Sequence, residues 1–465
     1  MTNLSFLTAT ELSTLLQTKQ LSPVELIKQV LDRIDQMDST INAYITTLNE
    51  SALKQAKEAE AAIMQGQYKG PLHGIPMGIK DNYQTKDIRT TGGSKLFRDS
   101  IPEQTATSVE KLLAAGGIMV GKLNMNELGA GSTGTNQLFG TTKNPWNTDH
   151  MPGGSSGGSA AALAAGMGAL TTGTDTWGSN RIPAAMSGVY GLKPTYGLIS
   201  TYGILPTASS LDHAGPLARS AADLALMLNF MAGFDPKDPA SLNTAIPDYT
   251  ADLNKGIKGI KIGIPTYYLE GLEPEVEKLF HSAVATLRNL GAEIKELEIP
   301  ELSMSTFAGF AISSSEAAAF NYETLQMQSA AYAQDTRALL LAGTLTSATQ
   351  YLKAQQVRRK LVKAIQKAFE EVDVILGPTI PITAPALGEN WAEQNLAVTA
   401  RCLPFTVPAN LTGIPSLSVP MGLCSKGLPA GMQFMGKHLS EKQLFQVGAA
   451  WESTKPLSYG TDEAG

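Results

Sequence analysis

The sequence predicts an α/β protein with a mixed or mostly parallel sheet that helices cover on both faces. In the second half of the chain, short apolar strand-like runs alternate with segments of helical periodicity, a pattern typical of such folds. In the first half, glycine-rich loops separate short β-rich runs from an alanine-rich helix. Hydrophobic residues make up 43% and charged residues 17% of the 465 residues, so we expect a sizeable globular core.

Helices are expected at the start of the chain, because each of two segments begins with capping residues. Thr8 and Glu11 have the spacing of a capping box, and Ser22 and Glu25 repeat that spacing. After Glu25 the apolar side chains recur with helical periodicity and fall on one face. A third helix, more polar and therefore more exposed, is predicted near residues 51–64.

The remaining elements are predicted from apolar runs, caps and turn residues. Strands are expected at residues 117–120, 260–264, 294–299, 372–376 and 417–419. Helices are expected at residues 159–165, 274–290 and 347–371. Another helix is expected after Ser220, which would form a capping box with Asp223. Between residues 234 and 256 the chain has three prolines and little periodicity, so we interpret that segment as a surface connection.

Charge and cysteine content exclude several classes of protein. The formal net charge is −6 and no basic run is present, so we expect no direct nucleic-acid partner. Cys402 and Cys424 are too few for a disulfide framework, so we expect two free thiols in a reducing compartment. The first residues do not have the pattern of a signal peptide, and no run approaches the ~18 apolar residues of a membrane span. We therefore predict a cytoplasmic protein with no membrane partner.

Two glycine- and serine-rich loops flank the alanine-rich helix, and a lysine lies upstream of them. The loops are Gly-Gly-Ser-Ser-Gly-Gly-Ser at residues 153–159 and Gly-Thr-Asp-Thr-Trp-Gly-Ser-Asn-Arg at residues 173–181. Glycine and serine let a backbone turn sharply and point N–H groups inward. Attack on an amide carbonyl needs a nucleophile, a base, donors for the oxyanion and a proton for the leaving nitrogen. Together with Lys80, the two loops are therefore a candidate hydrolytic site.

These segments resemble the sequence signature of the amidase signature family. The resemblance extends to Gly-Val-Tyr-Gly-Leu-Lys-Pro-Thr at residues 188–195 and to Lys-Asp-Asn at residues 80–82, and it covers nearly the whole chain. It implies an α/β/α fold around a central mixed sheet, in a single domain of residues 1–465. In that domain, N-terminal helices within residues 1–66 would pack on the outside, and residues 70–220 would form the catalytic signature region.

The resemblance implies a role for each polar residue of the loops. Ser179 would be the nucleophile, Ser155 the bridging serine held by a cis peptide bond, and Lys80 the base at the far end. A lysine accepts a proton only when neutral, and burial can lower its pKa from ~10.4 by up to ~3–5 units. Asp175 and Arg181 are expected to hold the loop by hydrogen bonds. The oxyanion hole would consist of the backbone N–H groups of Thr176, Trp177, Gly178 and Ser179.

Two positions depart from the family's pattern, which usually reads Asp-Thr-Gly-Gly-Ser-Ile-Arg. Trp177 replaces a glycine and would be strained if that position had a positive φ, and Asn180 replaces an apolar residue. Three explanations stay open: the pair reshapes the acyl pocket for a particular substrate, it was engineered, or it marks a weakened site. We hypothesise that Trp177 narrows the substrate pocket. Further candidates for pocket residues are Asn180, Met125 and Gly131, with ordinary packing as an equal alternative.

Two other motifs are weaker alternatives. Ser156 is at the centre of a Gly-x-Ser-x-Gly sequence, but no downstream histidine has a distinctive partner, which disfavours an α/β-hydrolase triad. Residues 116–123 approach a phosphate-binding loop, but Leu123 cannot supply the hydroxyl that holds magnesium. The sequence has no cluster of cysteine and histidine ligands, so we expect neither a metal nor another cofactor.

The resemblance includes two kinds of protein. Stand-alone amidases hydrolyse amides and sometimes esters or carbamates, whereas the A subunit of the glutamyl-tRNA amidotransferase releases ammonia from glutamine for a partner subunit. Residues 316–320 and 337–343 look more like the stand-alone enzymes, and Arg337 is a poorly placed candidate for binding the glutamine carboxylate.

We therefore predict a stand-alone hydrolase whose substrates are small amides, carbamates such as urethanes, or esters. Its oligomeric state stays open. The first alternative is the glutamine-hydrolysing A subunit of a tRNA-dependent amidotransferase. The second is a binding subunit without activity, in which Trp177 closes the pocket.

Overall fold

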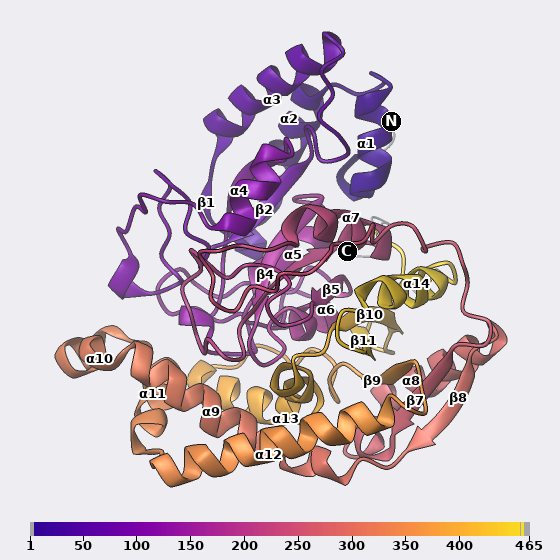
Figure 1. Cartoon of the computed structure of the whole chain (residues 1–465). Helices are drawn as coiled ribbons and strands as arrows, with labels where there is room; N and C mark the ends of the chain where they lie inside the picture. The colour runs from indigo at the N-terminus through magenta and orange to yellow at the C-terminus, as the bar shows by residue number, and fades with distance from the viewer. Residues whose placement is uncertain (1–3, 456, 460–465) are drawn as a thin grey trace.

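A large mixed sheet forms the centre of the molecule (Figure 1). The computed structural model describes residues 4–455 and 457–459. The 11 strands lie in the order β1-β3-β2-β4-β6-β5-β10-β11-β9-β7-β8, with parallel pairs around β2 and β7 and antiparallel pairs elsewhere. The strands are β1 (Tyr44–Thr47), β2 (Pro76–Lys80), β3 (Ile118–Leu123), β4 (Leu170–Asp175), β5 (Tyr190–Lys193), β6 (His213–Ala218), β7 (Lys261–Pro265), β8 (Glu293–Leu297), β9 (Val374–Pro378), β10 (Ser416–Leu423) and β11 (Pro429–Gly436).

Helices cover both faces of this sheet, which confirms the predicted fold class. On β10, Leu417 lies against Gly448 of a C-terminal helix, and its register partner on β11 is Phe434. Gly431 of β11 is three residues from Phe434 and so faces the other way, where it lies against Ala185. The helices that carry Gly448 and Ala185 therefore lie on opposite faces.

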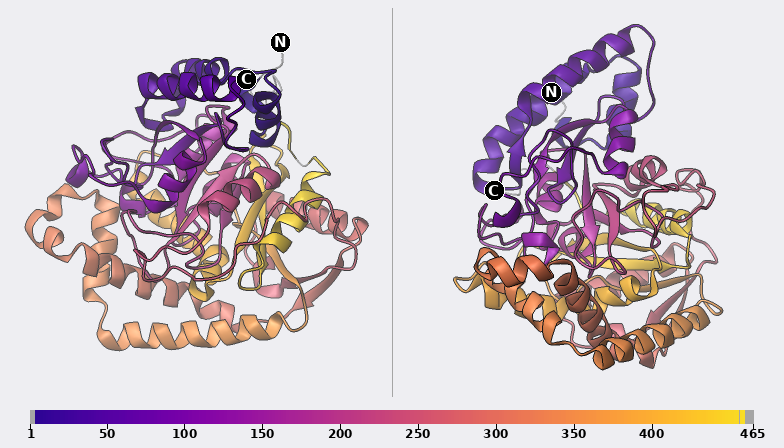
Figure 2. Two further views of the ribbon diagram at one scale, coloured as in Figure 1. Left: turned by 45° about the horizontal axis from the view of Figure 1, so that its top comes forward. Right: turned by 60° about the vertical axis from the view of Figure 1, so that its left-hand side comes forward.

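The helices differ widely in length. They are α1 (Ala9–Gln17), α2 (Pro23–Ile41), α3 (Asn49–Met64), α4 (Thr107–Ala114), α5 (Gly157–Ala164), α6 (Arg181–Ser187), α7 (Ala221–Met231), α8 (Pro274–Asn289), α9 (Ser305–Phe320), α10 (Tyr322–Gln328), α11 (Gln334–Leu345), α12 (Ala348–Ala368), α13 (Trp391–Thr412) and α14 (Glu441–Glu452). Figure 2 shows α1 to α3 and the group α9 to α12 at opposite ends of the molecule. No described helix is long and apolar enough to cross a membrane.

The elements that the sequence predicts lie close to their predicted positions, and about half of the observed helices and strands were not predicted. The strands predicted from residue 260 onward are β7, β8, β9 and β10, and the segment 234–256 forms neither helix nor strand. Helix α13 was not predicted, because it contains Pro404 and Pro408, which usually break helices. Strands β4 and β6 were also missed, because both are buried along their whole length and show no alternation of polar and apolar residues.

Helix caps agree with the sequence in one case and differ in two. The Thr8–Glu11 capping box forms as predicted. Ser22 caps α2 by accepting from the N–H groups of Val24 and Glu25, but the Glu25 side chain makes no return bond, so no reciprocal box forms. The third predicted box is also wrong, because the Asp223 carboxylate accepts from the N–H groups at the start of α1, at 2.8 and 3.0 Å. It thereby joins α1 to α7 across the sequence.

Candidate active site

Three segments meet at the carboxyl ends of two neighbouring parallel strands. Lys80 is the last residue of β2, and Asp175 is the last residue of β4. Because β2 and β4 pair in parallel, their carboxyl ends lie at the same edge of the sheet, which favours a site there. The loop before α5 comes to the same place, because the N–H of Ser156 donates to the carbonyl of Ser179 at 3.2 Å.

Lys80 is fully buried and hydrogen-bonded to three hydroxyl groups. Its ammonium Nζ lies 2.8 Å from Ser155 Oγ, 2.8 Å from Ser156 Oγ and 2.7 Å from Thr174 Oγ1. Within the described residues it forms no ion pair. Burial lowers the pKa of Lys80 to about 7, while the carboxylates of Asp175 and Asp212 act in the opposite direction. A substantial fraction of this lysine is therefore neutral at neutral pH and able to accept a proton.

Ser155 and Ser179 lie on the two loops on either side of α5. The peptide bond between Gly154 and Ser155 is cis, and Ser155 is 1% exposed. Ser179 is 5% exposed, and its hydroxyl has no hydrogen-bond partner among the described residues. The structure thus brings Lys80 and Ser155 into direct contact and holds the backbone of Ser179 beside the same loop.

The loop after β4 offers fewer free N–H groups than the sequence predicts. The N–H of Gly178 donates to Asp175 Oδ1 at 2.8 Å, so it is already used within the loop. The N–H groups of Trp177 and Ser179 have no acceptor among the described groups. Gly178 has a φ of +116°, and a Cβ there would lie 2.6 Å from Thr406, so this position requires glycine.

A buried ion pair supports this loop, as the sequence predicts. Arg181 is fully buried and donates to both carboxylate oxygens of Asp175 at 3.0 Å. Although burial alone raises it, the pKa of Asp175 lies well below its ordinary value, because the Arg181 guanidinium and the Asn410 amide stabilise the carboxylate. The remaining Arg181 donors bind Gln433, Asn410 and the carbonyl of Thr406. Because the Asp175 carboxylate and the Arg181 guanidinium are paired with each other and bonded to Asn410, the loop has a defined position.

Trp177 lies in an apolar environment and is not strained. It is not among the residues with positive φ, so it occupies the glycine position without the anticipated strain. Its indole is 9% exposed and lies 6.2 Å, centroid to centroid, from the ring of Phe310 on α9. Ala130 and Leu211 belong to the same apolar cluster. The indole Nε1 is buried and has no hydrogen-bond partner among the described residues.

The other candidate pocket residues are packed in the interior. Asn180 is fully buried, and its amide bonds Leu192 and Ser156 at the sheet, so the structure does not support it as a pocket wall. Met125 is also fully buried. A Cβ on Gly131 would lie 2.5 Å from the Asn126 amide, so Gly131 marks close packing of this loop.

Two residues beside Lys80 were not assigned a role by the sequence. Thr174 precedes Asp175 on β4, so its side chain points to the opposite face of the sheet from that of Asp175. This alternation could have identified Thr174 only if β4 had been predicted as a strand. Asp212 accepts from Thr176 Oγ1 at 2.5 Å and from the N–H groups of Thr207 and Ala208, and so fixes the start of the loop after β4. No motif in the sequence indicates that the charge of Asp212 acts on Lys80.

The structure also bears on the Gly-x-Ser-x-Gly motif and on possible metal ligands. Ser156 contacts Lys80 and no histidine. His213 bonds the Leu211 carbonyl at 2.6 Å and Lys193 at 3.1 Å. No group of three or more histidine, cysteine or acidic side chains that could hold a metal is found in the described part of the chain.

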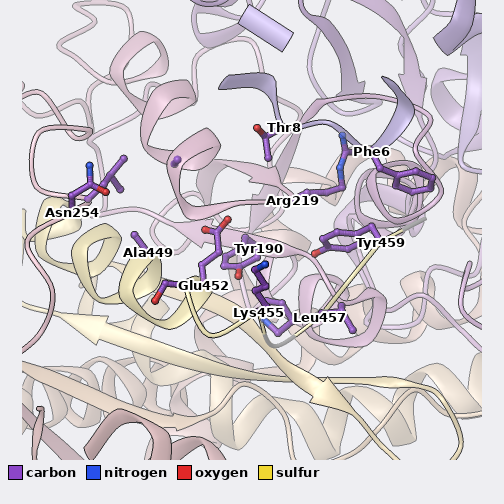
Figure 3. Close-up of a pocket in the computed structure, with 14 residues that line it drawn as sticks. Phe6, Thr8, Tyr190, Arg219, Asn254, Ala449, Glu452, Lys455, Leu457 and Tyr459 are labelled. Carbon is purple, nitrogen blue, oxygen red and sulfur yellow. The ribbon is translucent and has the colours of Figure 1, made fainter. Parts of the chain in front are cut away.

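A small cavity lies beside the Lys80 network, and a larger hollow lies away from it. The small polar cavity, of about 50 Å³, adjoins Thr174, Asn82 and Asp212, and it has room for one or two water molecules. The hollow, of about 610 Å³, lies between the N-terminal segment and the end of α14, lined among others by Phe6 and Glu452 (Figure 3). None of the predicted site residues lines that larger hollow.

Comparison with known proteins supports a hydrolytic site. A family model described as Amidase matches residues 25–445. The chain is 41% identical to the A subunit of the glutamyl-tRNA(Gln) amidotransferase of Geobacter sp. (strain M21), over 96% of both chains. A bacterial aryl acylamidase of the amidase signature enzymes superposes with a TM-score of 0.89 at 28% identity, over 97% of both chains.

A further solved structure is described as a vestigial protein complex that reveals the origins of an s-triazine catabolic enzyme. It superposes with a TM-score of 0.91 at 30% identity, over 97% of this chain and 99% of that one. The chain therefore belongs to the amidase signature family, and it is a hydrolase of carbon–nitrogen bonds.

Proposed function

We propose that Ser179 attacks the carbonyl carbon of an amide, with Ser155 and Lys80 moving the proton. Neutral Lys80 accepts a proton from Ser155, which takes the proton of Ser179 as its oxygen attacks. The developing oxyanion would be stabilised by the free N–H groups of Trp177 and Ser179. The proton then returns through Ser155 to the leaving nitrogen, and the C–N bond breaks. Water hydrolyses the resulting acyl-enzyme and releases the acid.

The observation that supports this mechanism most directly is the environment of Lys80. A buried lysine normally needs a carboxylate partner, since an unpaired buried charge is strongly unfavourable. Lys80 has three hydroxyl partners, and the Ser155 hydroxyl is one of them, at 2.8 Å. This environment favours a neutral amine in contact with the serine that relays the proton. It also disfavours the alternative of a binding subunit without activity.

We further propose that the acyl or carbamoyl group of the substrate is neutral and apolar. Trp177 lies beside the ring of Phe310 and belongs to the same apolar cluster as Ala130 and Leu211, so this side of the site is apolar. The nearby guanidinium of Arg358 is already bonded to both the carbonyl and the hydroxyl of Ser210 and to the Leu411 carbonyl. Three of its five N–H donors are therefore already used within the protein. Small amides, anilides and alkyl carbamates fit this description.

Glutamine hydrolysis for an amidotransferase is the other candidate, and the comparison of sequences favours it over the first. The observation that favours it is the 41% identity to a protein of that name over 96% of its length. Glutamine carries an α-carboxylate and an α-ammonium group, and each needs an oppositely charged partner in a closed site. The arginine predicted for the carboxylate, Arg337, lies on α11 and forms no ion pair with a described residue.

The decisive experiment measures ammonia or amine release from glutamine, aliphatic amides, anilides and ethyl carbamate, with Ser179→Ala as the control. Turnover of neutral amides or carbamates that the substitution abolishes is the expected result. Turnover of glutamine alone would replace the first proposal with the second. A serine-reactive phosphonate would label Ser179 in either case, and absence of both labelling and turnover would favour a binding role.

Trp177→Gly tests the apolar pocket separately. Removal of the indole should raise kcat/KM for bulkier acyl groups relative to small ones by ~10- to 200-fold, the range that pocket size controls. The measurement is the ratio of kcat/KM across a series of acyl chain lengths. An unchanged ratio would mean that Trp177 does not border the acyl group.

A further inference from the structure

Asn180 is buried next to Ser156, one of the three hydroxyl partners of Lys80. Its Nδ2 donates to the carbonyl of Leu192 on β5 at 2.9 Å, and this bond fixes which end of the amide is the donor. The oxygen Oδ1 therefore faces Ser156 Oγ, 3.3 Å away. The amide is fully buried, and a Cβ on Gly215 of β6 would lie 2.6 Å from Nδ2. Its orientation is thus set by its surroundings.

The hydroxyl of Ser156 has one proton to donate and several groups around it. Lys80 Nζ at 2.8 Å and the N–H of Thr174 at 3.3 Å both donate to Ser156 Oγ when Lys80 is charged. The proton of Ser156 then has two acceptors, Asn180 Oδ1 and the carbonyl of Thr174, each at 3.3 Å. With Asn180 present, the Ser156 lone pairs face the amine of Lys80.

We propose that Asn180 is a positioning residue, whose amide oxygen holds the Ser156 proton away from Lys80 so that Ser156 accepts from the amine. This inference rests on the proposed role of Lys80 as the base. An acceptor that faces the amine stabilises the charged form of lysine, whereas a donor would stabilise the neutral form. Asn180 thereby holds the protonated state of Lys80 at a higher pH than Ser156 alone would.

The charged groups around this pair belong to several elements. Asp175 at the end of β4 accepts from the N–H of Asn180 at 3.3 Å, and Arg181 of α6 neutralises it. Lys193 of β5 lies 3.1 Å from His213 of β6, and Asp212, whose charge acts on Lys80, precedes β6. An apolar residue at position 180 leaves all of these groups and the backbone bond to Asp175 in place. The side-chain bond to Ser156 is the difference that bears on Lys80.

Asn180→Ile tests the proposal, with Asn180→Leu as a second apolar variant and Ser156→Ala as the matched background. In the folded apolar variants, the acid-side midpoint of kcat/KM should move to lower pH by about 0.5 unit or more, the equivalent of one hydrogen bond. KM at high pH should stay unchanged, since Asn180 does not border the substrate. In the Ser156→Ala background the same substitution should shift nothing, because the connection to Lys80 is absent.

If the acid-side midpoint of kcat/KM is unchanged in an apolar variant whose turnover still depends on Ser179, the proposed role of Asn180 is overturned. The proposed function would then still stand. A shift of equal size in the Ser156→Ala background would also overturn the proposed role of Asn180, because the effect would not pass through Ser156. Failure of both apolar variants to unfold cooperatively would make Asn180 a structural residue. Turnover that survives Ser179→Ala would instead contradict the proposed function itself.

Discussion

Two buried lysines on neighbouring strands have opposite environments. Lys80 on β2 and Lys122 on β3 are both fully buried. Lys122 lies 3.5 Å from the carboxylate of Asp81 and donates to the Tyr83 carbonyl and Thr90 Oγ1, whereas Lys80 contacts only hydroxyls. Burial lowers the pKa of Lys122 to about 8 against the effect of Asp81, and that of Lys80 to about 7.

The difference shows how two similarly buried lysines can have different roles, one structural and one as a base. An ion pair with a full set of acceptors holds Lys122 between β3 and the segment that follows β2, as expected of a structural residue. Lys80 is held by three neutral hydroxyl groups, which stabilise its protonated form less than a carboxylate would, as expected of a general base.

Removal of the Lys80 amine should have the largest effect. Lys80→Met keeps the length and apolar stem of the side chain, and we expect kcat/KM for an amide substrate to fall by ~10²–10⁴-fold, the contribution typical of a general base. The thermal unfolding temperature should change little or rise, because no buried charge is left unpaired. Activity within tenfold of the parent would contradict the proposed role of Lys80.

Removal of the Lys122 amine should affect stability. Lys122→Met leaves Asp81 buried without its partner, so we expect the free energy of unfolding to fall by ~3–5 kcal/mol. The double variant Lys122→Met/Asp81→Asn should recover much of that loss, because neither charge remains. Chemical denaturation measures both, and a double variant less stable than the single one would contradict the structural ion pair.

The pH dependence should report the neutral form of Lys80. We expect kcat/KM to rise with pH through a midpoint near 7, since the base must be deprotonated and burial lowers its pKa to about 7. Between that pH and the ordinary lysine pKa, the unfolded chain binds more protons at Lys80 than the folded chain. The contribution of Lys80 to folding stability therefore rises with pH across this window. A flat profile from pH 6 to 9 would exclude Lys80 as the titrating base.

Removal of a single hydroxyl beside Lys80 should have the smallest effect on the pH profile. Thr174→Val removes one acceptor of the Lys80 amine and should lower the midpoint of the same profile by about 0.5 pH unit. Thr90→Val makes the matching change beside Lys122 and should leave the midpoint where it is. Equal shifts in the two variants would mean that the profile does not report on Lys80.

The sequence predicted more of the site than of the strands that build it. The sequence singled out Lys80, Ser155, Ser179 and the Asp175–Arg181 pair for the site because they lie in short motifs of fixed spacing. The use of Gly178 within its own loop was not foreseen, because the Asp175 carboxylate that takes its N–H acts through loop geometry. Asn180 was predicted to line the pocket because it follows Ser179 in the sequence, whereas in the structure its side chain is buried against Leu192 and Ser156.

By itself, the sequence determined the chemical groups and the class of fold, because capping residues, apolar periodicity and glycine–serine loops act over a few neighbouring residues. Only the tertiary structure decided what each buried group faces. Parallel pairing of β2 with β4 brings Lys80 to Thr174, and packing directs Asn180 toward Ser156. The protonation of a buried lysine depends on the dielectric and the partners that long-range contacts create, and no local pattern specifies them.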